Sequence, residues 1–287
     1  MNFILGAIIV IASVLGGYVA MHGKLSALNQ PFELVIIGGA ALGAFIISNQ
    51  KHVLKRSLKA VGIAIKGSRH KKQDFLELLS MQYQVYKLAR TKGMLALEQH
   101  VENPHESSIF SNYPHFVKEH HAVIFFCDYL RMITLGADKP HEIEALMDEE
   151  LEVHHEDELA LSHAFQTMSD GIPALGIVAA VLGVIKTMGA ITEPPEVLGR
   201  LIGGALVGTF LGVFLSYGYI GPLANALKGV ADSEARYYLC LKVGLLAHLS
   251  GCAPAISVEY ARKALEPHLR PTFYEVEEAV NALPSVA

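Results

Sequence analysis

Two stretches decide the fold of this chain: GIPALGIVAAVLGVIKTMGAI at 171–191 and LIGGALVGTFLGVFLSYGYIGPLANAL at 201–227. The second stretch contains no Asp, Glu, Lys or Arg over its whole length, and about 20 apolar residues are enough to cross a bilayer. A short turn with Glu193, Pro194 and Pro195 joins the two. Together they predict a membrane hairpin.

Small residues recur at every fourth position of the second stretch, at Gly204, Gly208, Gly212 and Ser216. This spacing places them on one face of a helix, where they let another helix approach the backbone closely. We expect that helix to come from a neighbouring copy or from a partner. The residues leave open whether this stripe or the face with Thr209 lines a pathway.

Composition sets the class of protein. Of 287 residues, 52% are hydrophobic and 18% are charged, and the mean hydropathy is +0.35, which indicates several membrane spans. The net charge of −5 does not suggest a nucleic-acid partner. The cysteines are far apart and form no CxxC motif, so free thiols are predicted at Cys127, Cys240 and Cys252.

Two further spans are predicted before the hairpin, at about 3–21 and 34–50. The first lacks a basic leading segment and a small-residue cleavage site, so it is not a signal peptide. Eight Lys or Arg residues follow between Lys51 and Lys72, whereas the loop at 21–32 holds only Lys24. The positive-inside rule therefore places both termini in the cytoplasm. The basic segment at 53–65 is also amphipathic enough to contact anionic lipid.

The predicted fold class is all-α, a polytopic membrane protein with four transmembrane helices and a helical cytoplasmic domain. Residues 1–50 hold the first two spans, 51–170 form the cytoplasmic domain, and 171–227 hold the spans at about 171–191 and 201–223. Residues 228–287 form a cytoplasmic helical tail.

Ion transport normally needs an ionisable group within the membrane. The predicted spans carry acids only at their ends, at Glu33, Asp170 and Glu193. Lys186 lies in the outer part of the third span, where its long side chain can reach the interface. If this chain moves protons, a partner must therefore supply the carboxylate.

A few residues are candidates for a pathway or a hinge. The hydroxyl of Thr209 can line a path, although a bond to the carbonyl one turn back is the commoner fate of such a group. Tyr217 and Ser216 share this ambiguity. Pro173 and Pro222 lie near the cytoplasmic ends of the hairpin helices, and Pro222 is expected to bend its helix.

Other charged residues have ordinary explanations when taken alone. Arg90 and Glu98 flank Gly93 and read as solvated charges, and the acidic run at 148–158 reads as a solvated face. The adjacent histidine pairs at 120–121 and 154–155 point apart on a helix, so no metal site is predicted. No phosphate-binding loop, nucleophile elbow, dinucleotide fingerprint or zinc motif occurs, which argues against an enzyme or a cofactor.

Several segments resemble the MotA family of bacterial flagellar stator subunits over nearly the whole chain. They are QPFELVIIGGAALGAFI at 30–46, ENPHESSIFSNYP at 102–114, DYLRMITLG at 128–136, HEIEALMDEE at 141–150, GIPALGIVAAVLGVI at 171–185 and ALVGTFLGVFLSYGYIGPLA at 205–224.

The resemblance implies an inner-membrane stator subunit that surrounds a MotB-like partner, as five copies around two. The partner brings a membrane aspartate and a peptidoglycan anchor, and ion flow, by protons rather than sodium, drives the ring against the rotor protein FliG. The matching positions imply rotor contact at Arg90 and Glu98, with Glu150 a weaker candidate. They imply coupling at Pro173 and Pro222, and they place Thr209 and Ala180 near the partner's aspartate. Lys186 belongs to no recognised motif.

Two alternatives differ in function. An energiser of the ExbB/TolQ type would drive an envelope system, but such relatives usually have three spans, and the second span here together with Arg90 and Glu98 argues against this alternative. A membrane scaffold would conduct no ions, and co-expression with a partner would distinguish it through the absence of an ion leak.

Overall fold

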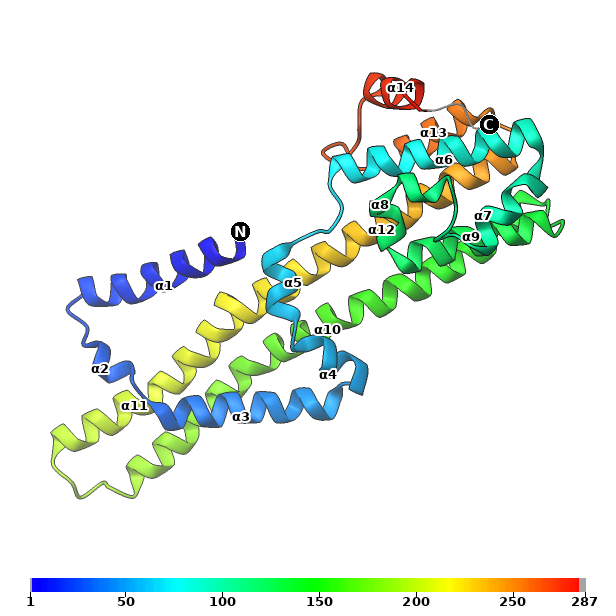
Figure 1. Ribbon diagram of the computed structural model, residues 1–287. Helices are drawn as coiled ribbons and strands as arrows, with labels where there is room; N and C mark the ends of the chain where they lie inside the picture. Colours follow the sequence, from blue (N-terminus) through cyan, green and yellow to red (C-terminus); the bar gives the residue numbers. More distant parts are fainter. Residues whose placement is uncertain (1, 284–287) are drawn as a thin grey trace. The chain divides into compact units, whose positions relative to one another are not determined.

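The computed structural model describes residues 2–283, and within that range the chain consists of helices and connecting turns with no strand (Figure 1). The prediction of an all-α fold is confirmed. The first helices are α1 (Asn2–Ala20), α2 (Leu25–Leu28), α3 (Pro31–Ser48), α4 (Lys51–Ser57), α5 (Ala60–Lys66) and α6 (Lys72–Lys92). The middle elements are η1 (Met94–Leu97), α7 (Glu98–Glu102), η2 (Phe110–Asn112), α8 (Pro114–Lys118), α9 (His120–Thr134) and α10 (Pro140–Met188). The last are α11 (Pro195–Leu215), the π-helical turn η3 (Ser216–Ile220), α12 (Gly221–Leu249), α13 (Pro254–Lys263) and α14 (Phe273–Asn281).

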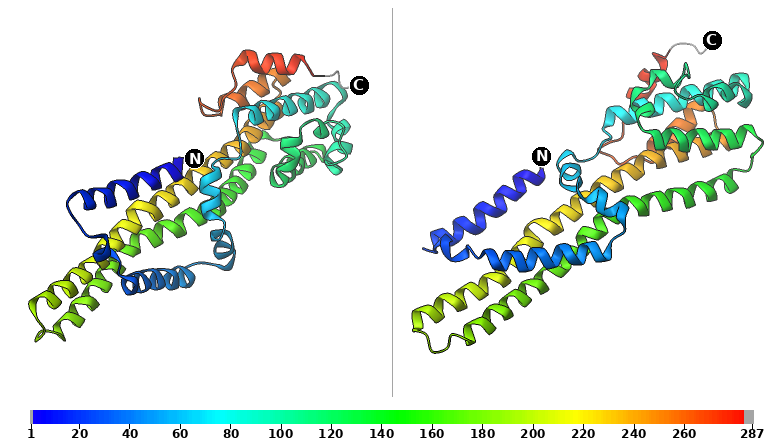
Figure 2. Two further views of the ribbon diagram at one scale, coloured as in Figure 1. Left: turned by 60° about the vertical axis from the view of Figure 1, so that its left-hand side comes forward. Right: turned by 60° about the horizontal axis from the view of Figure 1, so that its bottom comes forward.

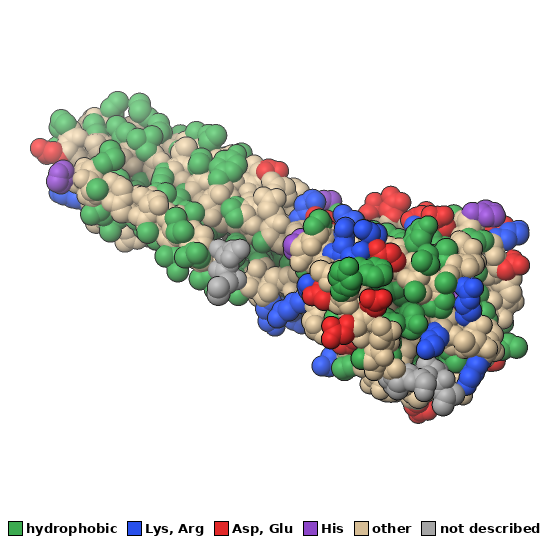
Figure 3. All heavy atoms as spheres, turned by 90° about the horizontal axis from the view of Figure 1, so that it is seen from above, with side chains coloured by type: hydrophobic (Ala, Val, Ile, Leu, Met, Phe, Trp, Pro, Cys, Tyr) green, Lys and Arg blue, Asp and Glu red, His purple; other side chains and the backbone are tan. Residues whose placement is uncertain are grey.

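The helices form two compact units, and each is built from two separate stretches of chain. The membrane unit comprises Met1–Gly67 and Asp157–Ala231, and the insert–tail unit comprises Ser68–Glu156 and Asp232–Ala287. Among the described residues, four helices are long and apolar enough to cross a membrane, as predicted, within Phe3–Ala20, Leu25–Ser48, Pro140–Met188 and Pro195–Leu249. Figure 3 shows that hydrophobic side chains dominate the surface of the membrane unit, whereas charged side chains gather on the insert–tail unit.

The membrane unit takes in more of the chain than the expected boundaries at residues 51 and 170. The basic segment of α4 and α5 buries Val53, Ala60 and Ala64 against a cluster that includes Leu161 and Leu223. Part of its apolar surface therefore packs on protein, while Leu58 and Val61 stay exposed, and the contact with anionic lipid stays a prediction.

Ion pairs hold the same segment in place. Arg56 lies 2.9 Å from an Asp157 carboxylate oxygen and 2.6 Å from one of Glu158. These contacts explain why the end of the acidic run, at Asp157 and Glu158, belongs with the membrane helices.

The insert–tail unit has its own hydrophobic core, in which α6, α9, α12 and α13 meet (Figure 2). Phe75 and Tyr86 of α6, Phe126 of α9 and Tyr237 of α12 are all fully enclosed. Burying an aromatic side chain of this size removes about 150–250 Å² of surface from water, so these residues dominate the stability of the unit. The exposed charges Arg90 on α6 and Glu98 on α7 are therefore carried by a well-packed unit.

One helix is longer than predicted. The sequence suggested an acidic helix that opens at Pro140 and a separate span from Gly171, but α10 runs without interruption from Pro140 to Met188. Pro173 lies inside it. A proline in a helix interior leaves one carbonyl without its usual N–H partner, here the carbonyl of Ser169.

Candidate functional site

The hairpin helices α10 and α11 pack backbone to backbone through glycines. A Cβ added to Gly212 would lie 2.9 Å from the Cα of Gly176 and 3.1 Å from the carbonyl oxygen of Ile172. Because real Cβ atoms do not approach backbone atoms so closely, only glycine fits at position 212. The two helices also run side by side in all three ribbon views (Figures 1 and 2).

The same packing continues along the stripe. A Cβ on Gly208 would lie 3.1 Å from the backbone nitrogen of Ala180, and one on Gly183 would lie 2.9 Å from the Cα of Ala205. The helix that approaches the stripe is therefore α10 of the same chain. The sequence suggested a neighbouring copy or a partner, because periodicity alone does not say which helix fills a small-residue groove.

Two polar side chains from the start of α3 fill the rest of the stripe. The amide nitrogen of Gln30 lies 3.1 Å from the position of a Cβ on Gly204, and a carboxylate oxygen of Glu33 lies 3.2 Å from that of a Cβ on Gly208. The Glu33 Oε2 atom is buried and has no hydrogen-bond partner among the described residues. Sequence reasoning placed Glu33 only at the end of a span and missed that its carboxylate reaches the α10–α11 contact.

Thr209 and Ala180 both lie at the level of Gly208. The backbone of Ala180 packs against Gly208, and Thr209 follows Gly208 directly in α11. Thr209 is half-buried, and its hydroxyl makes no hydrogen bond within the described part of the chain. In contrast, the Thr187 hydroxyl donates to the Gly183 carbonyl at 2.9 Å. The Thr209 hydroxyl is therefore free to bind water or a partner group.

Tyr217 lies away from this contact. Its side chain is 68% exposed and belongs to η3, two helical turns beyond Thr209. The structure therefore places Tyr217 at another level of the hairpin than Thr209 and Ala180.

The carbonyl freed by Pro173 is satisfied from the other helix of the hairpin. In a regular helix the N–H of residue 173 would donate to the carbonyl of Ser169, but proline has no N–H. Here the hydroxyl of Ser216 donates to that carbonyl at 2.6 Å, and the hydroxyls of Ser169 and Ser216 lie 3.0 Å apart. Both serines are almost fully buried. Ser216, ambiguous in the sequence, thus stabilises the proline-containing turn of α10.

Pro222 follows a π-helical turn. Its ring would clash with the Gly218 carbonyl in a regular helix, and the π turn η3 at Ser216–Ile220 lies directly before it. Pro222 is exposed and borders a cavity of about 480 Å³ together with Gly6 and Val10 of α1 and Ala64 of α5. Ser216 is the first residue of this π turn, so its contact with Ser169 lies only a few residues before Pro222.

We expect Ser216→Ala to loosen this region. The substitution leaves the Ser169 carbonyl buried without a donor, at a cost of about 1–3 kcal/mol in the free energy of unfolding. The thermal melting temperature of the purified chain in detergent should fall. Ser250→Ala is the matched control, because its hydroxyl donates only to a carbonyl within its own helix end and the residue is exposed. An equal effect of the two changes would contradict the role assigned to Ser216.

The three charged candidates lie on the insert–tail unit. Arg90 is exposed in the last turn of α6, and Glu98 is exposed in the first turn of α7. Between them, Gly93 has a positive φ of 86°, which ends α6 and turns the chain. Neither Arg90 nor Glu98 forms an ion pair with another described residue. Both charges are therefore available to a partner.

Glu150 differs from these two. It is exposed on α10, yet its carboxylate accepts a hydrogen bond of 2.7 Å from the Tyr129 hydroxyl. Burial first, and then this hydrogen bond, raise the pKa of Tyr129 above its ordinary value, so the hydroxyl stays a donor. Glu150 is thus held in a fixed position by α9.

Buried histidine supports the segment that carries Glu98. The Nδ1 atom of His100 lies 2.9 Å from the Ser107 hydroxyl, and burial lowers the pKa of His100 below its usual 6.5. A histidine with a lowered pKa in the folded state stabilises that state above the unfolded pKa, and this stability is lost as the pH falls through the folded pKa.

We therefore expect amide hydrogen exchange in residues 94–110 to speed up, after correction for intrinsic rates, as the pH falls from about 7.5 to about 5.5. His100→Gln should remove this pH dependence, since glutamine does not titrate. A dependence that persists in the variant would assign it to another group. His105→Gln, a change at a neighbouring histidine on the exposed surface, serves as the control.

The cysteines are free, as predicted. Cys127 and Cys240 are buried and Cys252 is half-buried. Burial raises the pKa of the Cys127 thiol to about 12, which keeps it protonated and unreactive.

Comparison with known proteins identifies the family. Residues 4–93 match the family model described as Motility protein A N-terminal, and residues 119–238 match the MotA/TolQ/ExbB proton channel family. Motility protein A of Salmonella typhimurium is 43% identical over 283 residues, which cover 99% of this chain and 96% of that protein. The chain belongs to the MotA family of flagellar stator subunits. It is accordingly a multi-pass inner-membrane protein of a channel and stator family, and not an enzyme.

Solved structures agree with the MotA-family fold. The flagellar MotAB stator complex from Bacillus subtilis matches with a TM-score of 0.70 and 26% identity, over 89% of this chain and 92% of that one. The MotAB structure from C. jejuni matches with a TM-score of 0.75 over 93% and 96% of the two chains, and at 20% identity it shows the fold alone. The match to the motility N-terminal model favours a MotA-type subunit over an ExbB/TolQ-type energiser.

Proposed function

We propose that this MotA-family chain assembles with a MotB-like partner, that the complex conducts protons, and that the flow turns the flagellar rotor. The observation that carries the proposal is the free hydroxyl of Thr209 in α11, in a hairpin whose own helices carry no acid at 171–188 or 201–215. The Glu33 carboxylate of α3 is packed into the α10–α11 contact against Gly208. Between Gly171 and Met188 and between Leu201 and Leu215, Lys186 is the only charged residue. Protons crossing at this level need a carboxylate on the open face. Because the Glu33 carboxylate is packed into the α10–α11 contact, the partner's membrane aspartate supplies it.

The pathway in this proposal runs along the face of the hairpin that presents Thr209 and Ala180. The Gly204–Ser216 stripe is occupied by α10, Gln30 and Glu33 of the same chain, so it supports the hairpin and leaves the neighbouring face for the partner helix. A proton-motive force supplies about 2.3 kcal/mol per charge for each 100 mV, enough to drive a conformational step in the ring.

Assembly as a ring of five copies around two partner helices is part of the same proposal and rests on the family resemblance. The first helix supports it, because α1 leaves large apolar side chains such as Ile4, Ile8 and Ile11 exposed. Neighbouring copies and membrane lipid cover such surfaces. The basic segment from Lys51 to Lys72 supports an orientation with both termini, residues 51–170 and the tail from 228 in the cytoplasm.

Rotor contact in this proposal is made by Arg90 and Glu98, which are exposed and unpaired within the described residues. Glu150 takes a secondary part, because its carboxylate is already engaged by Tyr129. The partner of these charges is FliG.

Coupling in this proposal uses the two proline turns. The Ser169–Ser216 contact joins the turn that carries Pro173 to the π turn before Pro222. A change in the conformation of one turn therefore alters the hydrogen bonds of the other. π turns are also frequent at functional sites.

Thr209→Val tests the pathway. Valine keeps the shape and removes the hydroxyl, so proton flux and swimming speed should fall about ten-fold, as for the loss of one hydrogen bond of about 1.4 kcal/mol. Thr209→Ser should retain most of the function. Thr187→Val is the control, because the Thr187 hydroxyl bonds within α10. Normal swimming with Thr209→Val would overturn the placement of the path.

A further inference from the structure

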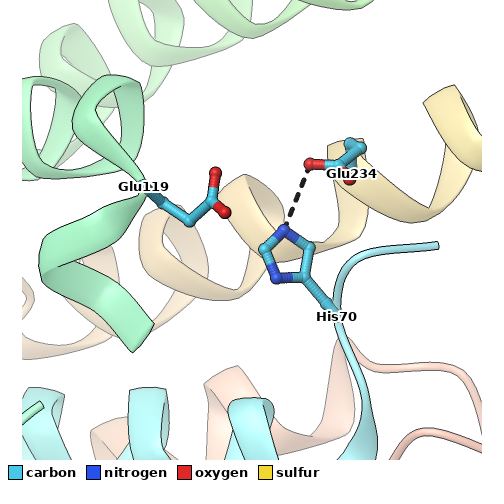
Figure 4. A group of neighbouring side chains, drawn as sticks. All are labelled: His70, Glu119 and Glu234. Carbon is cyan, nitrogen blue, oxygen red and sulfur yellow. Dashed lines mark hydrogen bonds and ion pairs between the residues drawn. The ribbon is translucent and has the colours of Figure 1, made fainter. Parts of the chain in front are cut away.

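Three side chains from separate parts of the insert–tail unit meet at one point. His70 lies in the segment before α6, Glu119 directly precedes α9, and Glu234 lies in α12. One ligand atom from each of the three lies within 4.8 Å of the others. Figure 4 shows both carboxylates directed toward the imidazole ring of His70.

The cluster is enclosed and its histidine is held in position. The side chains of His70, Glu234 and Glu119 are 1%, 11% and 21% exposed. The ring of His70 stacks on Tyr237 with centroids 4.0 Å apart, and Phe75 contacts its edge. A side chain that is already fixed in its rotamer loses little entropy when it binds a ligand.

The polar atoms of the cluster are not fully satisfied. His70 Nε2 lies 3.2 Å from Glu234 Oε2, but Glu234 Oε1 is buried and has no hydrogen-bond partner among the described residues. Arg69 is the positively charged group beside that atom, with its Nε 3.7 Å away. A terminal guanidinium nitrogen of Arg69 also lies 3.7 Å from a carboxylate oxygen of Glu119. The Arg69 side chain is 66% exposed and is therefore free to move into solvent.

One imidazole and two carboxylates are the donor set of a transition-metal site. Zn²⁺ binds histidine nitrogen and carboxylate oxygen at about 2.0–2.2 Å and commonly takes three protein ligands with water in the fourth position. Mg²⁺ prefers oxygen ligands and keeps several waters, so the imidazole disfavours it. A divalent cation also neutralises the two carboxylate charges in this enclosed position.

We propose that His70, Glu119 and Glu234 bind a divalent transition-metal ion of the Zn²⁺ class. The bound ion ties the segment before α6, the start of α9 and the middle of α12 together within the insert–tail unit. It replaces Arg69 as the cation between the two carboxylates. Sequence reasoning missed the site because its residues are far apart in the chain and follow no spacing motif.

The test uses the full-length chain in detergent, purified with an affinity tag that lacks histidine and stripped of metal with a chelator. Zn²⁺ is then added, and bound metal per chain and the melting temperature are measured, with Mg²⁺ in parallel. We expect a single Zn²⁺ ion per chain and a higher melting temperature with Zn²⁺ but not with Mg²⁺. Co²⁺ should give the visible absorption of a site with a nitrogen ligand.

Two variants and a control locate the site. His70→Gln and Glu234→Gln should each weaken Zn²⁺ binding at least about ten-fold and remove the Co²⁺ absorption. Glu234→Gln keeps the shape and the hydrogen-bonding capacity of the side chain, so it guards against a variant that merely fails to fold. His120→Gln, an exposed neighbour of Glu119, should bind as the native chain does. Zn²⁺ binding that is absent from the native chain, or unchanged in both variants, would overturn the proposal and leave the cluster an ion-pair network with Arg69.

Discussion

Replacing Gly212 by alanine is expected to force α10 and α11 apart and to abolish swimming. The new methyl group would lie 2.9 Å from the Cα of Gly176, a backbone atom that cannot rotate away. Overpacking of this kind costs about 1–3 kcal/mol in the free energy of unfolding, and here the strain falls on the helices beside Thr209. The amount of chain in the membrane, its melting temperature and the fraction of swimming cells are the measurements.

The matched control is Gly203→Ala in the same helix. A Cβ on Gly203 meets no atom within 4 Å, so only the helix propensity changes, which favours alanine by about 0.5–1 kcal/mol. Gly203→Ala should therefore be neutral or slightly stabilising in the isolated chain. If both variants swam and melted like the native chain, the close glycine contact would not be a requirement of the hairpin.

Arg90→Glu is expected to stop rotation while the chain still inserts and assembles. The side chain is exposed and forms no ion pair with another described residue, so its reversal breaks no ion pair. Like charges placed opposite each other across an interface cost several kcal/mol, which is enough to reduce torque more than about ten-fold. Swimming speed and co-purification with the MotB-like partner are measured on the same strain.

Lys92→Glu, two residues further along and equally exposed, controls for a general change of surface charge. A compensating charge reversal on FliG should restore swimming to Arg90→Glu but not to Gly212→Ala. Loss of the partner from the purified Arg90→Glu complex would instead show that the charge serves assembly.

The fold follows from features that are local in the sequence. Uncharged runs of sufficient length predict the four spans, and Gly93 and Pro140 mark a helix end and a helix start where the structure has them. The continuity of α10 through Pro173 could not be predicted in this way. It depends on Ser216, 43 positions later, whose hydroxyl replaces the missing N–H partner of Ser169.

In the candidate site, too, local features could be predicted from the sequence and contacts between distant residues could not. The glycine stripe is evident in the sequence, but its occupants are not, because Gln30 and Glu33 reach it only after α3 has packed against α11. The sequence also could not show that the Thr209 hydroxyl is free. The commoner bond, to the carbonyl of the preceding turn, is not made among the described residues. The proposed roles of Arg90 and Glu98 rest on the family resemblance, since exposed charges alone carry no such signal.

The most direct test of the account is the cytoplasmic pH of cells that express the chain alone, with a MotB-like partner, or with a partner whose membrane aspartate is changed to asparagine. In the proposed complex this chain contributes the hairpin and the partner contributes the proton-binding carboxylate. We therefore predict acidification only when the chain and the unaltered partner are present together. Acidification by the chain alone, or equal acidification with the asparagine partner, would contradict this prediction.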